Sequence, residues 1–244
     1  MQPFIPRLGG KSKLARRLVR LFPPHDIYIE PFIGGGSVFL RKERVGKEVI
    51  NDVDKEIVQL WKGMQSSAGK LQKFDFTPKR EVFDKLVKSK PRGVVQRMYR
   101  TIYRYRNSFG GRGEIYADKN ARRAGHNLKR NLEKYQERLQ GVQILNSDWK
   151  AVVRRHSKAG SFTFLDPPYQ TETTKWIYTP ISAKDLIPTL QKIKGKFLMT
   201  YESTPQIRKM FRGAGFRVSG VKTTYTVAPG KKKTNVTTLI VRNY

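Results

Sequence analysis

Four consecutive residues, Asp166, Pro167, Pro168 and Tyr169, place a carboxylate, two prolines and an aromatic ring side by side. At about 5% usage per residue, this tetrapeptide occurs by chance in roughly one chain of this length in several hundred. The Asp166 carboxylate and the Pro167 carbonyl, which the following proline holds extended, can both accept N–H groups, and Tyr169 offers an aromatic face. These residue types favour a binding site over the competing interpretation, a rigid proline turn with a capping Asp and a packed Tyr.

A glycine-rich turn follows an apolar run earlier in the chain. Phe32, Gly34 and Gly36 resemble a nucleotide-binding turn, in which missing side chains let a cofactor approach the backbone. Asp52 lies 16 residues beyond Gly36, near the spacing of an acid that binds a ribose. The third glycine of the dinucleotide pattern is missing, so the turn alone fits a tight connection equally well. The three histidines, at 25, 126 and 156, have no metal-ligand spacing, and no metal is expected.

The predicted strands and helices alternate, which indicates an α/β fold with a parallel sheet. A helix is expected directly after the glycine turn, from Ser37. Ligands of open α/β sheets bind beyond the carboxyl ends of the strands. Glu30, Asp52 and Asp166 follow three such ends and are expected to face one crevice. The predicted strands are 27–32, 49–52, 142–145, 162–165 and 196–201, and 216–226 and 237–241 form a C-terminal antiparallel hairpin with a lysine turn at 231–233.

Residues from about 74 to 139 show the 3.6-residue apolar period of helices. The clearest helices are 94–104 and 128–139. Between them, the turn-rich segment 107–113 carries a lone aromatic residue and reads as an exposed loop or hairpin. The predicted organisation is one domain built from residues 1–65 and 142–244, interrupted by a helical insert at 66–141.

The 244 residues include 50 Lys and Arg against 19 Asp and Glu, a formal net charge of +31 that points to a polyanionic partner. Because 38% of the residues are apolar, the chain can form a core, and the disordered class is excluded. The absence of cysteine excludes disulfides, Cys-based metal sites and cysteine nucleophiles. No apolar run has the length of a membrane span and the N-terminus lacks the apolar segment of a signal peptide, so a cytoplasmic protein without membrane contact is expected.

The order of these landmarks resembles the Dam-like adenine-N6 DNA methyltransferases, which use S-adenosyl-L-methionine. The resemblance covers nearly the whole chain and rests on Gly9-Gly10-Lys11, residues 30–39, Asn51-Asp52, the helical insert, Asn146-Ser147-Asp148 and the Asp-Pro-Pro-Tyr tetrapeptide. It implies a Rossmann-like methyltransferase sheet, with Asp52 on the ribose hydroxyls of the cofactor and Asp148 near its adenine. The cofactor pocket would be lined by Gly9, Gly10, Lys11, Glu30, Phe32, Gly34, Gly36, Asp52, Asp148 and Asp166.

The resemblance also implies that Asp166, Pro167, Pro168 and Tyr169 are catalytic. The N6 amino group of adenine is a poor nucleophile because its lone pair is delocalised, so acceptors that favour its pyramidal form promote transfer. A base inside a duplex cannot reach such a pocket, so the target is expected to flip out and stack on Tyr169. The expected partner is double-stranded DNA, bound by a monomer through the insert. Pairing with a restriction enzyme, replication timing and self-protection of a virus are roles that would all use this methylation chemistry. The DNA contacts are assigned to Arg104, Arg106, Asn107, Phe109 and Arg112.

Two departures from the family limit what the resemblance implies. Arg7 stands where many members have an aromatic residue, and residues 105–116 do not match those that read GATC in the best-known members, so no recognition sequence is implied. The alternative acceptors are the N4 amino group of cytosine and N6 of adenine in RNA; the lack of cysteine excludes ring-carbon cytosine methylation. A catalytically inactive DNA-binding relative and a nucleotide-dependent oxidoreductase are further alternatives, the last of which leaves the tetrapeptide and the charge unexplained.

Overall fold

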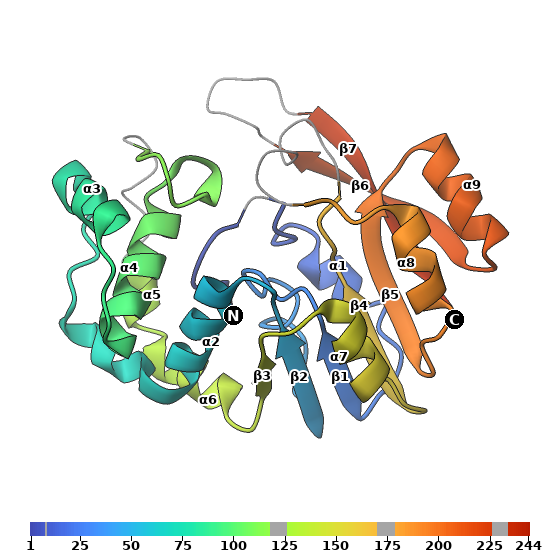
Figure 1. Cartoon of the computed structure of the whole chain (residues 1–244), viewed down its shortest axis with the longest axis horizontal. Helices are drawn as coiled ribbons and strands as arrows, with labels where there is room; N and C mark the ends of the chain where they lie inside the picture. Colours follow the sequence, from blue (N-terminus) through green and yellow to red (C-terminus); the bar gives the residue numbers. More distant parts are fainter. Residues whose placement is uncertain (8, 118–125, 170–178, 226–233) are drawn as a thin grey trace.

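The computed structural model describes residues 1–7, 9–117, 126–169, 179–225 and 234–244. Its centre is a seven-stranded sheet of order β3-β2-β1-β4-β5-β7-β6 (Figure 1). Strands β1 to β5 run parallel, and β7 pairs antiparallel with β5 and β6. The predicted α/β sheet and closing hairpin are therefore confirmed, while the lysine turn at 231–233 lies outside the described residues. The strands are β1 (Ile27–Glu30), β2 (Lys47–Asn51), β3 (Gln143–Leu145), β4 (Ser161–Leu165), β5 (Lys196–Glu202), β6 (Arg217–Tyr225) and β7 (Thr234–Arg242).

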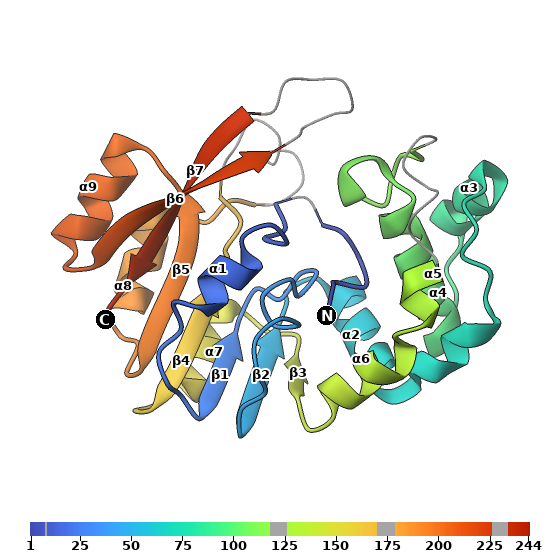
Figure 2. The ribbon, with the colours of Figure 1, turned by 180° about the vertical axis from the view of Figure 1, so that it is seen from behind.

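Helices cover both faces of the sheet (Figures 1 and 2). Alternate residues of β5 enter different cores, because side chains of a strand point to opposite faces. Leu198 packs in the cluster that includes α1 and α2, whereas Phe197 and Met199 pack with α7, α8 and α9. No helix in the described ranges is long and apolar enough to cross a membrane. The helices named here are α1 (Ala15–Val19), α2 (Lys55–Ser67), α7 (Trp149–His156), α8 (Ala183–Leu190) and α9 (Pro205–Gly213).

In the described ranges, four further α-helices lie between β2 and β3 in the sequence and gather beside α2, at one side of the sheet (Figure 1). Met98 and Ile102 of this group share one buried cluster with Trp61 of α2 and Ile50 of β2. The helix expected over 128–139 is divided in two, because Asn131 has φ −116° and ψ 9°, outside the helical region. These helices are α3 (Arg80–Lys88), α4 (Val94–Arg106), α5 (His126–Lys129) and α6 (Leu132–Leu139).

The helix expected from Ser37 is not present. Residues 34–42 form turns, with backbone bonds of helical spacing from Leu40 N to Gly36 O (3.0 Å) and from Lys42 N to Val38 O (3.1 Å). The chain then turns into β2, and the Lys42 ammonium enters the core to pair with Glu48. The Glu48 carboxylate also accepts from Arg138 of α6 at 2.5 Å. This buried ion-pair group fixes the end of the turn and joins the sheet to the helices beside it.

Candidate active site

The carboxyl ends of β1, β2 and β4 lie next to one another at one edge of the sheet. In the register, Glu30 of β1 is opposite Ile50 of β2, and Ile29 is opposite Thr163 of β4. The segments that leave these three strands therefore start side by side. The structure thus brings together the glycine turn, Asp52 and the tetrapeptide that begins at residue 166, as the strand-end argument predicted.

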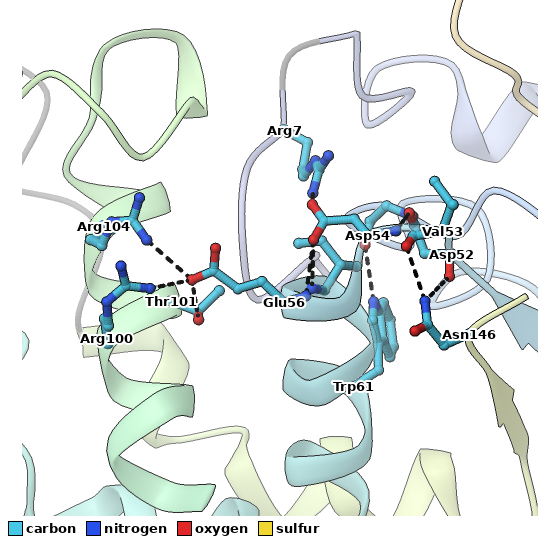
Figure 3. Close-up of polar contacts among 12 residues, drawn as sticks. Arg7, Asp52, Val53, Asp54, Glu56, Trp61, Arg100, Thr101, Arg104 and Asn146 are labelled. Atoms are coloured by element: carbon cyan, nitrogen blue, oxygen red, sulfur yellow. Dashed lines mark hydrogen bonds and ion pairs between the residues drawn. The ribbon is translucent and has the colours of Figure 1, made fainter. Parts of the chain in front are cut away.

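The Asp52 carboxylate anchors the glycine turn. Its Oδ2 accepts from the Gly34 backbone N–H at 2.9 Å, and its Oδ1 accepts from Asp54 N at 3.0 Å. Burial raises the pKa of Asp52 above that of an ordinary aspartate, and the positive charge of Arg7 acts in the opposite direction. The Gly34 carbonyl in turn accepts the indole N–H of Trp61 at 2.9 Å (Figure 3). The turn is therefore held through its backbone from two sides, and its conformation is fixed.

Both the backbone conformation and the packing require a glycine at position 36. Its φ is +67°, a region that residues with a Cβ rarely adopt. A Cβ built there would lie 2.4 Å from two ring atoms of Trp61, far inside van der Waals contact. The close approach of this backbone to the indole explains why the turn has a glycine here.

Asn51 connects three segments at the same edge. Its side chain is 1% exposed, and its Nδ2 donates to Pro31 O at 2.9 Å and to Ser147 O at 3.0 Å. Its Oδ1 accepts from Ser147 N at 2.9 Å. The amide therefore satisfies backbone groups after β1 and after β3. No role was expected for Asn51, although a polar residue at the end of an apolar strand is the signal that could have identified it.

A chain of polar contacts leads from the Asp52 loop to α4 (Figure 3). Arg7 Nη1 lies 3.3 Å from Asp54 Oδ2, and Asp54 Oδ1 caps α2 by accepting from Glu56 N at 2.9 Å. Arg7, the departure from the family pattern, therefore contacts the loop that carries Asp52. The Glu56 Oε1 accepts from three donors on α4: Arg100 (2.7 Å), Thr101 (2.9 Å) and Arg104 (3.1 Å).

Asp166 is held by two donors from distant parts of the chain. The Lys11 ammonium, 4% exposed, lies 2.6 Å from Oδ1 and 2.9 Å from Oδ2, and it also donates to Gly9 O at 2.9 Å. Gly10 N donates to Arg7 O at 3.0 Å, which closes the tight turn before Lys11. From β5, the fully buried Thr200 donates its hydroxyl to Asp166 Oδ1 at 2.6 Å. The carboxylate nevertheless remains 20% exposed at the edge of the sheet.

The rest of the tetrapeptide forms one wall of this site. Pro167 is buried, and the Pro168 carbonyl accepts from Ile181 N at 2.9 Å. The Tyr169 ring is half-buried, with its centroid 5.5 Å from Lys11 Nζ and 5.3 Å from the Tyr201 ring. These contacts place the Tyr169 ring beside the ammonium that binds the neighbouring carboxylate.

Three residues expected to line the cofactor pocket, Glu30, Phe32 and Asp148, make contacts with other residues of the protein. Glu30 is 2% exposed and accepts from the Tyr28 hydroxyl at 2.6 Å, and burial raises its pKa to about 8. The Phe32 ring packs against Trp149, with centroids 5.6 Å apart. Asp148 is exposed and caps α7 by accepting two backbone N–H groups, at 2.9 and 3.2 Å. All three lie at or just after the strand ends. The hydrogen bond to Tyr28 and the cap of α7 give the carboxylates of Glu30 and Asp148 structural roles.

The five residues assigned to DNA contact differ in how exposed they are and in the contacts they already make within the protein. Arg104 binds Glu56 and a loop carbonyl, and Arg106 donates to a carbonyl of the N-terminal segment at 2.7 Å. Burial lowers the pKa of Arg106 to about 10. Asn107 is 1% exposed, and Arg112 is half-buried. Phe109, by contrast, is 45% exposed.

Phe109 belongs to a small hairpin at the end of α4. Ser108 and Tyr116 form an antiparallel bridge, and Phe109 N donates to Ile115 O at 2.8 Å. Ile115 is 69% exposed, so the hairpin presents two large apolar side chains to solvent. Ile115 was not among the residues expected to contact DNA, although an isolated apolar residue in a glycine-rich loop could have indicated it.

Residues of the types that bind metals do not cluster in the part of the chain that the structure describes. No cluster of three or more His, Cys, Asp or Glu side chains there could hold an ion.

Comparisons with known proteins identify the family. The family model for D12 class N6 adenine-specific DNA methyltransferases matches residues 8–227. The Type II methyltransferase M.CviBI of Paramecium bursaria Chlorella virus NC1A is 26% identical over 264 residues, which cover 100% of both chains. Type II methyltransferase M1.LlaDCHI of Lactococcus lactis subsp. cremoris is 25% identical, with 100% of this chain and 96% of the relative covered. The DNA adenine methylase of Vibrio cholerae is 23% identical, with 92% and 89% covered. The chain therefore belongs to the D12 class of N6 adenine-specific DNA methyltransferases, whose methyl donor is S-adenosylmethionine.

Proposed function

We propose that the protein methylates N6 of an adenine that has flipped out of duplex DNA into the edge of the sheet beyond β1, β2 and β4. The observation that carries this proposal is the Asp166 carboxylate, which Lys11 and Thr200 hold in place directly before the Pro167 carbonyl. Asp166 and Pro167 each accept one N–H of the adenine amine and thereby favour its pyramidal, nucleophilic form. Tyr169 supplies the face on which the flipped base stacks.

The residues of the glycine turn fit S-adenosylmethionine. A Cβ built on Gly34 would meet no atom within 4 Å, so the backbone there has space around it. The Asp52 carboxylate can accept from the ribose hydroxyls, and the neighbouring Val53, 79% exposed, offers an apolar surface to an adenine ring. The bound cofactor supplies an electrophilic methyl group on a sulfonium. The role of these residues is to bind and orient it.

We assign residues 66–141 to DNA recognition. We also propose that the protein acts as a monomer. Residues 85–145 contain sixteen Lys and Arg against four Asp and Glu, which suits a phosphate backbone. The hairpin of Phe109 and Ile115 is the part of this segment suited to enter the base stack, because its apolar side chains are already exposed. The type II names of two relatives support a partner endonuclease of matching specificity.

Replacing Asp52 by asparagine is expected to weaken binding of S-adenosylmethionine by about 10- to 100-fold, because a charged acceptor for the ribose is lost. Isothermal titration with S-adenosylhomocysteine measures the change. Asp54→Asn is the matched control: it alters the cap of α2 in the same loop and should change the affinity by less than about threefold. Equal losses in the two variants would assign the effect to the loop and not to a ribose contact.

Replacing Phe109 by alanine is expected to lower kcat/KM for duplex DNA by about 10-fold or more. The reason is that the Phe109 ring no longer fills the space that the flipped base leaves in the stack. The midpoint of thermal unfolding should stay within about 1 °C, since the ring is exposed. Val94→Ala is the control, because Val94 is 44% exposed at the opposite end of α4, a helix about 18 Å long. A similar loss in Val94→Ala would remove the special role of the hairpin.

The affinity for DNA with a weakened target pair tests base flipping. The methylated sequence is first read by sequencing N6-methyladenine in a treated plasmid. Two duplexes of that sequence are then compared, with the target adenine opposite thymine or opposite an abasic site. Flipping predicts about 10-fold tighter binding to the abasic duplex, because less pairing energy is lost on extrusion. Equal affinities would contradict a flipped base.

A further inference from the structure

Thr200 is a polar residue in the buried part of β5, where its neighbours are Phe197, Leu198, Met199 and Tyr201. It lies on β5 between Met199 and Tyr201 and is 0% exposed. Met199 is opposite Leu165 in the register of β4 and β5, so Thr200 lies beside Asp166, one residue beyond the end of β4. Its Oγ1 is 2.6 Å from Asp166 Oδ1 and 3.5 Å from Leu165 O. A hydroxyl has one proton, and the shorter contact to a charged acceptor takes it.

The donors around Asp166 are divided unequally between its two oxygens. Oδ1 receives the Thr200 hydroxyl at 2.6 Å and the Lys11 ammonium, also at 2.6 Å. Oδ2 receives Lys11 alone among the described residues, at the longer distance of 2.9 Å. Since a carboxylate oxygen accepts two hydrogen bonds, Oδ1 is saturated and Oδ2 keeps capacity for one more N–H.

Lys11 alone would not fix this orientation. Its ammonium is carried on a flexible stem and bridges both oxygens, so it can follow a small rotation of the carboxyl plane and keep the ion pair. The Thr200 hydroxyl contacts one oxygen only, from a buried β-strand, and therefore fixes the rotation of the carboxyl plane. Methyl transfer demands that an acceptor lie within a few tenths of an ångström of its productive position.

We propose that Thr200 is a positioning residue for methyl transfer: it saturates Asp166 Oδ1 and so presents Oδ2 to the amino group of the target base. This role rests on the proposed function of Asp166 as the acceptor of that amine. Thr200 touches neither substrate. It acts through the carboxylate that it orients.

The substitution Thr200→Val keeps the shape and β-branching of the side chain and removes only the hydroxyl. Single-turnover methylation of duplex DNA is expected to slow by about 10- to 100-fold, as for the loss of a hydrogen bond to a charged group in the transition state. KM for S-adenosylmethionine and the Kd for DNA are expected to stay within about twofold. Thr200→Ser retains the hydroxyl and is expected to restore the rate to within about threefold of the parent.

Thr163 provides a matched control. It lies on the neighbouring strand β4, is also 0% exposed, and its hydroxyl has no hydrogen-bond partner in the described structure. Thr163→Val is therefore expected to leave the rate unchanged. If it slows transfer as much as Thr200→Val, or if serine at 200 fails to restore the rate while both proteins melt at the parent temperature, the proposal is wrong.

Asp166→Asn in the same assay separates this proposal from the proposed function. An inactive Asp166→Asn protein together with a fully active Thr200→Val protein overturns the role of Thr200 alone. An active Asp166→Asn protein overturns the role of Asp166, and the role of Thr200 with it.

Discussion

Replacing Asp166 by alanine lowers the rate of methyl transfer by about 1,000-fold or more on this account, while the affinity for DNA changes by less than about threefold. The rate falls because the adenine amine loses the acceptor that localises its lone pair. The affinity persists because phosphate contacts dominate it and involve other residues. Rapid-quench measurement of methyl transfer and fluorescence anisotropy of labelled duplex DNA give the two numbers.

The alanine variant also removes the carboxylate that pairs with Lys11, a residue that is 4% exposed, and so lowers stability. Asp166→Asn is the variant that separates chemistry from folding. Its carboxamide oxygen can still accept from Lys11 and Thr200, but its NH₂ then faces the adenine amine, donor against donor. Equally low activity in both variants is expected. More than about a tenth of the parent rate in Asp166→Asn would contradict the assigned role.

Replacing Gly36 by alanine is expected to reduce the free energy of unfolding by about 2–5 kcal/mol. The left-handed backbone costs an alanine about 1–2 kcal/mol, and its Cβ would lie 2.4 Å from the Trp61 ring, an overlap that costs about 1–3 kcal/mol more. Urea unfolding followed by tryptophan fluorescence measures the loss, and Trp61 lies at the altered contact.

Gly34→Ala is the control for the backbone contribution. Gly34 also has a positive φ, +46°, but a Cβ there meets no atom within 4 Å. Its loss of stability is therefore expected to be limited to about 1–2 kcal/mol. If the two variants lose the same amount, the packing of Gly36 against Trp61 does not determine the turn.

The fold and the location of the candidate site could be predicted from the residues at the strand ends. Strands of a parallel sheet read as short apolar runs, and their carboxyl ends meet at one edge, so Asp52 and Asp166 could be placed together from sequence. The prediction of a helix from Ser37 was wrong. Helix propensity is a local property and does not include the tertiary ion pair between Lys42, only five residues later, and Glu48 inside the core.

The roles of single polar residues depended on tertiary contacts that no local pattern contains. Thr200 lies in the buried part of β5, and only the pairing of β4 with β5 brings its hydroxyl to Asp166. Asn107 fits a DNA contact by type, yet it is 1% exposed because it ends α4 and bonds to a carbonyl one turn earlier. Asp148 follows the family order, and its position also makes it the cap of α7.

The product of methylation tests the central claim most directly. The protein is incubated with S-adenosylmethionine labelled in its methyl group and mixed-sequence duplex DNA, and the DNA is digested to nucleosides and separated. The account predicts label in N6-methyladenine, and none when single-stranded RNA replaces the duplex. Label in N4-methylcytosine, or label in RNA without label in DNA, would contradict it.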